Sequence, residues 1–160
     1  MTEADTPAIC EVAASGIAHR VVRTERPSSA EESAALQGID VGQLIRSIVV
    51  RRGAGDYVFV LVPGGRQIEW AQLRAHLGVG RLSLPDREEA RDATGYERGT
   101  ITPFASSTAW PVVADASLID RDVVAIGAGA HGVNIHVAPA DLVRILGAEV
   151  ADVTGPRPDA

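Results

Sequence analysis

The sequence predicts an α+β fold, with helices covering a twisted, mixed or antiparallel β-sheet in a single compact domain. Three observations predict this class. The chain has 160 residues, the length of one domain, and 46% of them are hydrophobic, enough for a sizeable core. Predicted strands outnumber predicted helices, and most strands follow one another without a crossover helix. We expect one domain over residues 1–160 with its core at about 8–154, and flexible tails at 1–6 and 155–160.

The first third of the chain combines short helices with one extended segment. Residues 8–14 predict a short helix, and residues 19–23 have the alternating polarity of a strand. A helix then begins at Ser29, which precedes Glu32 at the spacing of a capping box, and it ends at Gly38. We therefore expect a helix that is fixed at both ends by its own sequence.

A β-hairpin follows. Asp40 and Gln43 repeat the capping-box spacing before a single short turn. Residues 47–51 and 57–62 are rich in β-branched and aromatic side chains, and the glycine-rich residues 53–56 separate them. This pattern predicts two adjacent antiparallel strands.

Two helices are predicted in the middle of the chain. Trp70, Leu73 and Leu77 share one face of a helix expected over residues 67–77, which should cover the sheet. A second helix, at residues 86–95, starts with a capping-box pair and stops at a glycine. It leads the chain directly into the loop discussed below.

The last third returns to strands. Apolar runs at 111–114, 123–126 and 133–137 are separated by turn residues, which predicts three strands. Residues 139–146 predict a helix, because a proline suits its first turn and a glycine follows it. A short strand at 149–153 completes the order.

Charge and cysteine content limit the function classes. The net charge is −6, and all fifteen basic residues are arginine. An acidic chain is a poor candidate for long, non-specific contact with nucleic acid, whose strength scales with the phosphates neutralised. The single cysteine, Cys10, cannot form an internal disulfide, and no apolar run reaches the eighteen residues of a membrane span. These features predict a cytoplasmic protein with no membrane partner, and leave its oligomeric state open.

The most informative segment is Gly95–Phe104, here called the signature loop. Two glycines, a proline and two aromatic residues stand within ten positions: G-Y-x-x-G-x-x-x-P-F. Glycine tolerates positive φ and allows a ligand to approach the backbone, while Pro103 stiffens the exit of the loop. The pattern predicts a binding loop with exposed N–H groups.

This signature resembles that of the YbaK/ProX family, prolyl-tRNA synthetase-associated domains that hydrolyse wrongly charged aminoacyl-tRNA. The similarity extends over about residues 8–154 and keeps the family's order of parts. The segments that carry it, besides the loop, are 29–38, 44–50, 127–135 and 139–143. The resemblance implies a compact α/β domain around a mixed sheet, and an aminoacyl-tRNA deacylase as the activity.

The resemblance implies catalytic roles for Arg46, Ser47 and Gly99. Arg46 stands where most relatives have lysine, and its guanidinium could hold a terminal phosphate or ribose but could not act as a general base at neutral pH. Ser47 replaces a threonine and keeps a hydroxyl that could position a water or a substrate group, or serve a structural role. The backbone N–H of Gly99 could stabilise the oxyanion, a contribution typically worth about 10²–10³ in rate.

Further residues are expected to line the substrate pocket. Gly127 and Asn134 stand where many relatives have serine and aspartate, so the amino-acid specificity is left open. The predicted substrate-binding residues are His19, Thr100, Ile101, Thr102, Pro103, Phe104, Gly127, Gly129, His131, Gly132 and Asn134. We expect His76 and His136 to be structural, and no cofactor or metal site, because the chain has no recognisable ligand spacing.

The leading hypothesis is a free-standing trans-editing hydrolase that removes cysteine, alanine or serine from tRNA, with tRNA for proline preferred. Its partners are the acceptor end of aminoacyl-tRNA and prolyl-tRNA synthetase. One alternative is a catalytically weak relative that binds an aminoacyl-tRNA end or an adenosine-like ligand without turnover. A third hypothesis is a docking module for a synthetase or a ribosome-associated partner.

Overall fold

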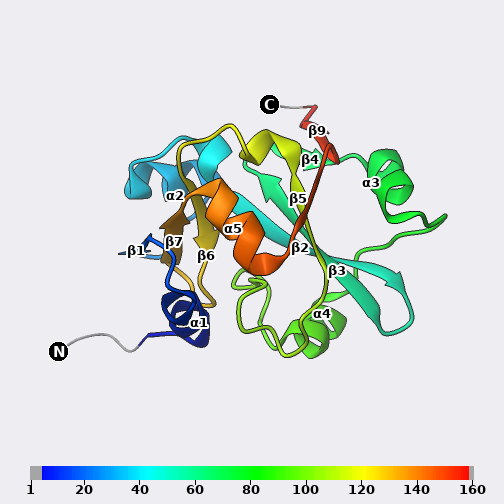
Figure 1. Ribbon diagram of the computed structural model, residues 1–160, viewed down its shortest axis with the longest axis horizontal. Coiled ribbons are helices and arrows are strands. Elements are labelled where there is room, and N and C mark those ends of the chain that lie inside the picture. Colours follow the sequence, from blue (N-terminus) through cyan, green and yellow to red (C-terminus); the bar gives the residue numbers. More distant parts are fainter. Residues whose placement is uncertain (1–4, 159–160) are drawn as a thin grey trace.

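The computed structural model describes residues 5–158 and contains one twisted β-sheet region flanked by helices (Figure 1). Two strand groups have the orders β1-β7-β6 and β2-β3-β5-β8. Their strands are β1 (His19–Arg23), β2 (Ile45–Gly53), β3 (Asp56–Pro63), β5 (Val112–Asp115), β6 (Val124–Gly127), β7 (Val133–Val137) and β8 (Glu149–Ala151). A parallel bridge between Leu44 and Ala125 places β6 beside the start of β2 and joins the two groups.

The sheet is mixed, as the sequence predicts. β2 and β3 form the expected antiparallel hairpin, in which Ser47 lies opposite Leu61. β1, β7 and β6 are also antiparallel, whereas β5 pairs in parallel with both β3 and β8. The predicted α+β class is therefore confirmed.

Alternation along β2 divides the sheet into two faces. Ile45 and Val49 belong to a core cluster that includes Leu142 of α5 (Pro139–Leu146) and the buried side of α1 (Pro7–Ser15). We call this side the α5 face. Val50, with Val60 and Val62 of β3, belongs to a second cluster that includes Leu73 of α3 (Trp70–Leu77). We call this side the α3 face. Because side chains alternate along a strand, Ser47 lies on the α5 face and Arg46 on the α3 face.

The predicted caps are present. Ser29 accepts a hydrogen bond from the Glu32 N–H at the start of α2 (Ala30–Gln37), although the Glu32 carboxylate bonds to Ser28 rather than back to Ser29. Asp86 accepts from the Glu89 N–H at the start of α4 (Arg87–Thr94). The predicted helix face of Trp70, Leu73 and Leu77 packs on the second core cluster. Local sequence signals thus determine these helices.

Two boundary predictions are wrong. The helix predicted over residues 67–77 begins only at Trp70, because Arg66–Ile68 forms strand β4, which pairs antiparallel with β9 (Thr154–Pro156). The Arg66 guanidinium bonds to Thr154 Oγ1 at 2.7 Å and to Thr154 O at 2.9 Å, which holds the pair together. The strand predicted at 149–153 accordingly ends at Ala151, and the chain resumes pairing in β9.

The predicted tails are shorter than expected within the described residues. Thr6 caps α1 by accepting a hydrogen bond from the Ile9 N–H at 3.1 Å, so the helix begins at Pro7 rather than Ala8. At the other end, residues 155 and 156 belong to β9. The rest of the predicted tails, residues 1–4 and 159–160, lies outside the described residues.

Candidate active site

The signature loop is braced from within. Gly95 ends α4 in the left-handed conformation, and the Tyr96 N–H then donates to Thr94 Oγ1 at 3.1 Å. The Tyr96 hydroxyl donates to the Phe104 carbonyl at 2.6 Å, which joins the two ends of the loop. Thr102 is fully buried and Phe104 belongs to the main core cluster. The loop is therefore fixed at both ends while its middle remains exposed.

That exposed middle lies against the glycine-rich turn between β6 and β7, residues 127–134. A Cβ on Gly99 would lie 3.0 Å from His131 Cε1, and a Cβ on Gly127 would lie 4.0 Å from the Ile101 carbonyl oxygen. Tyr96 packs on Gly129, where a Cβ would lie 2.9 Å from the ring. The fold thus brings the two glycine-rich segments named in the sequence analysis into one site.

Gly99 has the backbone freedom and the donor that the predicted role requires. Its φ is +92°, a conformation that L-residues rarely adopt. Its neighbour Thr100 uses both its N–H and its hydroxyl on the Glu97 carbonyl, at 3.0 and 2.8 Å. The Gly99 N–H makes no hydrogen bond to any residue in the range 5–158, and the residue is exposed. An exposed, unused N–H can donate to a substrate oxygen.

The α3 face of the sheet adds side chains beside this turn. Asn134 of β7 lies opposite Gly127 of β6, so the two share a face. Leu44 and Ala125 form a parallel bridge, and Arg46 and Gly127 lie two residues after them along the two strands. Arg46 and Gly127 are therefore neighbours on the same face of the sheet. The backbone of the turn, an amide side chain and a guanidinium therefore occur on one side of the sheet.

Arg46 is half-buried and partly fixed. Its Nη2 donates to the Arg66 carbonyl at 2.7 Å. Burial, and after it the positive charge of Arg157, lowers the pKa of the Arg46 guanidinium. The group still carries its charge at neutral pH, so it can hold an anion but cannot act as a base there.

Several predicted residues are not brought to this place. The Ser47 hydroxyl is buried on the α5 face, with no hydrogen-bond partner within residues 5–158, and so points away from Arg46. His19 also lies on the α5 face, opposite Val137 at the far end of β1 from the glycine turn, and its Nδ1 contacts the Ile17 carbonyl at 2.9 Å. Thr102 and Phe104 are buried, and so support the loop from below.

The remaining predicted residues lie in the loop or the turn. Pro103 is half-buried between the two buried residues of the loop, and His131 is exposed at the tip of the turn. Gly132 has φ +73°, and the Thr24 carbonyl occupies the position that a Cβ would need. The absence of a side chain at Gly132 therefore allows the turn to pack closely against the residue that follows β1.

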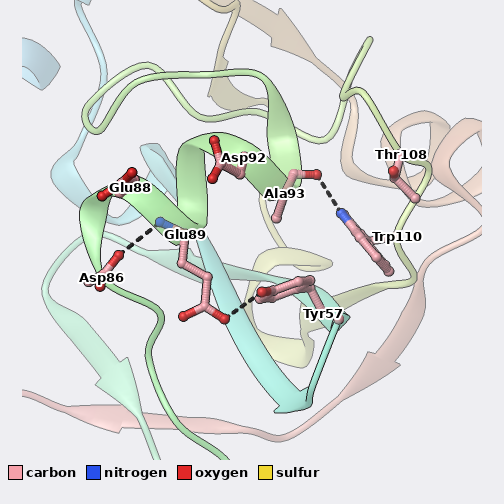
Figure 2. A pocket seen from close by; sticks show the side chains of 9 residues that line it. Tyr57, Asp86, Glu88, Glu89, Asp92, Ala93, Thr108 and Trp110 are labelled. Atoms are coloured by element: carbon pink, nitrogen blue, oxygen red, sulfur yellow. Dashed lines mark hydrogen bonds between the residues drawn. The ribbon is translucent and has the colours of Figure 1, made fainter.

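A separate hollow of about 480 Å³ lies beside α4 on the other face of the sheet (Figure 2). Its aromatic lining is Tyr57 and Trp110, whose rings meet edge to face at 5.1 Å. Four carboxylates line it: Asp86, Glu88, Glu89 and Asp92. Such a concentration of negative charge repels phosphate, so the hollow is no candidate for a nucleic-acid end.

Within residues 5–158, no three or more histidine, cysteine, aspartate or glutamate side chains are grouped so that they could hold a metal ion. None of the helices in that range is long and apolar enough to cross a membrane.

Sequence reasoning missed three supporting residues. The loop pattern includes Tyr96 but assigns it no role, whereas in the structure its hydroxyl bonds to the Phe104 carbonyl and its ring packs on Gly129. Thr6 belongs to the predicted tail, although Thr followed by Pro is a helix-start signal. Glu11, whose carboxylate accepts a hydrogen bond from the Ala105 N–H, has no local signal because the two are far apart in the sequence.

An exposed backbone donor beside a glycine-rich turn, with an arginine on the same sheet face as Gly127, is a suitable set of groups for a hydrolase that relies on backbone and substrate groups. The family model described as "Aminoacyl-tRNA editing domain" matches residues 24–145. The chain therefore belongs to the aminoacyl-tRNA editing domain family, and it is a hydrolase that removes amino acids from tRNA.

Named relatives agree with this assignment. The chain is 29% identical over 141 residues to the "Multifunctional Ser/Thr-tRNA deacylase ProXp-y" of Escherichia coli (strain K12), covering 86% of this chain and 84% of that protein. It is 31% identical over 152 residues to the proline–tRNA ligase of Stenotrophomonas maltophilia (strain K279a), covering 91% of this chain but 26% of the ligase. A solved structure described as a proposed trans-editing enzyme for prolyl tRNA synthetase is 28% identical with a TM-score of 0.78, covering 86% and 87%.

Proposed function

We propose that this protein edits in trans, removing a small, wrong amino acid from tRNA for proline, with serine as the first substrate and alanine and cysteine as further ones. The contact of the loop at Gly99–Ile101 with the turn at Gly127–Asn134 supports the proposal: Gly99, whose N–H is unused, lies against His131, and Ile101 lies near Gly127, the residue opposite Asn134. The Asn134 amide could hydrogen-bond the hydroxyl of a serine substrate. The name of the Escherichia coli relative supports serine as well.

The proposed reaction is ester hydrolysis. A water molecule attacks the carbonyl carbon, the bond to the ribose oxygen breaks, and that oxygen leaves with a proton, which gives the free amino acid and uncharged tRNA. The Gly99 N–H donates to the carbonyl oxygen as its negative charge develops. The adjacent ribose hydroxyl, or the thiol of a cysteine substrate, assists the water, and positioning supplies much of the rate.

Arg46 contributes to substrate capture in this proposal. Its charge lies on the same sheet face as Gly127 and Asn134, where it could contact the terminal phosphate or ribose. For Ser47, the buried hydroxyl favours the structural role over the positioning of water. The half-buried Thr100 and Ile101 and the exposed His131 form the rim of the proposed pocket.

The need for such an editor has a physical basis. A synthetase pocket discriminates against a smaller side chain by only about 1–3 kcal/mol per methylene, so it admits some serine, alanine and cysteine in place of proline. A second, smaller site can remove them. This reasoning favours prolyl-tRNA synthetase as the functional partner, and the similarity to a proline–tRNA ligase supports it. We place the protein in the cytoplasm, as one editing domain over residues 1–160.

A panel of mischarged tRNAs tests the proposal. Purified protein is incubated with seryl-, alanyl-, cysteinyl- and prolyl-tRNA for proline, and loss of the amino acid is followed against a protein-free control. We expect the three wrong amino acids to be released and proline to be retained. Binding of these tRNAs without release would instead support the alternative of a weak relative that binds without turnover.

A further inference from the structure

The first helix, α1, lies outside the residues that the family model matches, yet it contacts both halves of the site. Its apolar side, Ala8, Ile9 and Val12, is buried in the main core cluster, which fixes its place beneath the strands. Figure 1 shows α1 at the lower ends of β6 and β7, on the side of the molecule from which the signature loop emerges.

The beginning of α1 contacts the glycine-rich turn. The Thr6 hydroxyl donates to the Ala128 carbonyl at 2.6 Å, while it accepts from the Ile9 N–H as the helix cap. Ala128 is fully buried and directly precedes Gly129. One side chain therefore fixes both the helix start and the backbone of the turn.

The middle of α1 contacts the signature loop. The Glu11 carboxylate accepts a hydrogen bond from the Ala105 N–H. Within residues 5–158, Ala105 is the one residue other than glycine with positive φ, at +56°. A non-glycine residue in that conformation is strained and persists only where its surroundings hold it, and such strain occurs often at functional sites.

Tyr96 joins this contact to the reacting part of the loop. Its hydroxyl donates to the carbonyl of Phe104, the residue before Ala105, and its ring packs on Gly129. Burial, and after it the negative charge of Glu11, raises the pKa of Tyr96, so the phenol stays protonated as a donor at neutral pH. Loop, turn and helix thus form one continuous set of contacts.

We propose that α1 is a positioning element of the editing site: through Thr6 and Glu11 it holds the glycine turn and the signature loop at the spacing that the reaction requires. This inference rests on the proposed function, because spacing matters only if the ester lies between these two segments. Neither residue touches the substrate, so both act through the backbone that they fix. Losing either contact should impair the chemical step more than substrate binding.

The test measures kcat and KM for the release of serine from seryl-tRNA by Glu11→Ala and Glu11→Gln. Glu11→Ala should lower kcat by about tenfold or more with KM nearly unchanged, and Glu11→Gln should restore part of the rate because it keeps an acceptor oxygen. The matched control is Cys10→Ala, a change at the neighbouring exposed position of the same helix.

A second readout does not depend on activity. Amide hydrogen exchange at Ala105 should become faster in Glu11→Ala, while the melting temperature changes by no more than about 4 °C. Thr6→Val should likewise lower kcat, and Thr6→Ser should retain it because the hydroxyl remains.

The outcomes separate the two proposals. If the unmodified protein releases serine and Glu11→Ala does so at the same kcat, the positioning role of α1 is wrong. The positioning role would also be wrong if Cys10→Ala lost as much kcat as Glu11→Ala, or if unfolding of Glu11→Ala explained its whole loss of kcat. If the unmodified protein releases no amino acid at all, the substrate assignment fails. Faster exchange at Ala105 in Glu11→Ala would still support the contact by which α1 holds the signature loop.

Discussion

At the scale of single residues, we expect the largest loss of deacylation activity from a substitution of Gly99. Gly99→Ala adds a methyl group at φ +92°, where it meets His131 Cε1 at 3.0 Å. We expect kcat/KM for deacylation to fall by about 10²-fold or more, comparable to the loss of an oxyanion donor, while the fold is retained. Steady-state kinetics on mischarged tRNA measure the effect.

The matched control for this substitution is Gly78→Ala. Gly78 ends α3 with φ +69° and has nothing within 4 Å of an added Cβ, so Gly78→Ala introduces a similar backbone strain outside the signature loop and the glycine-rich turn. Its activity should be unchanged. An unaltered kcat/KM in Gly99→Ala would remove the loop from the mechanism, and recovery in Gly99→Ala with His131→Ala would identify the contact with the ring as the cause.

Arg46 is expected to act in substrate capture. Arg46→Ala should raise KM by about tenfold with a smaller change in kcat, because it removes a charged contact that substrate and transition state share. Arg46→Lys should retain activity if a point charge suffices. Arg91→Ala, at an exposed arginine in the last turn of α4, serves as the control. Equal losses in Arg46→Lys and Arg46→Ala would mean that the planar guanidinium is required.

At the scale of elements, His136 links a helix to the sheet. Its Nε2 lies 2.9 Å from Gln37 Oε1, so it joins β7 to α2. Burial, and after it the charge of Arg20, lowers the pKa of His136. Because the folded pKa lies below the unfolded value of about 6.5, this group adds stability above pH 6.5 that is lost as the pH falls through the folded pKa.

We therefore expect the free energy of unfolding to decrease on acidification below about pH 6.5. Urea denaturation of the unmodified protein and of His136→Gln at pH 7.5 and pH 5.5 measures this. The decrease should be smaller in His136→Gln, because a glutamine side chain at this position does not titrate. Identical pH dependence in the two proteins would assign the effect to other groups.

The helices of this fold could be predicted from local signals, whereas some strand pairings could not. Capping pairs such as Asp86 and Glu89 act within a few residues, so the sequence pattern alone identifies them. β4 and β9 are three residues each and are held by the side chain of Arg66 across 88 positions, which leaves no periodic pattern to detect.

Part of the candidate site, like part of the fold, could be predicted from the sequence. The sequence predicts that both glycine-rich segments line one pocket, and the structure brings Gly99 of the first to His131 of the second. The opposite orientation of Ser47 and Arg46 was also available from strand alternation, since Ile45 and Val49 are apolar and Ser47 lies between them. The supports from Thr6 and Glu11 depend on tertiary contacts alone, and no sequence pattern indicates them.

At the scale of the whole molecule, the distribution of charge limits how tRNA is held. The chain has a net charge of −6, and four carboxylates gather around the hollow beside α4. Contact should therefore be confined to the acceptor end, with about two or three phosphates. The slope of log K against log salt should be near −2, because each phosphate contributes about 0.7–0.9. Binding measured across a salt series gives this slope.

A minihelix that contains only the acceptor stem provides the comparison. It should bind about as well as the full tRNA if the contacts are limited to that end. A slope steeper than about −5, or no binding to the minihelix, would show that the protein holds the body of the tRNA through a broader basic surface.

The most direct test of the account compares two substrates on one tRNA. The quantity is the ratio of kcat/KM for release of serine and of proline from the same tRNA for proline, measured with the unmodified protein. We predict a ratio of at least about tenfold in favour of serine, because the editing pocket selects the smaller, polar side chain. Equal release of both amino acids, or release of neither, would contradict the central claim.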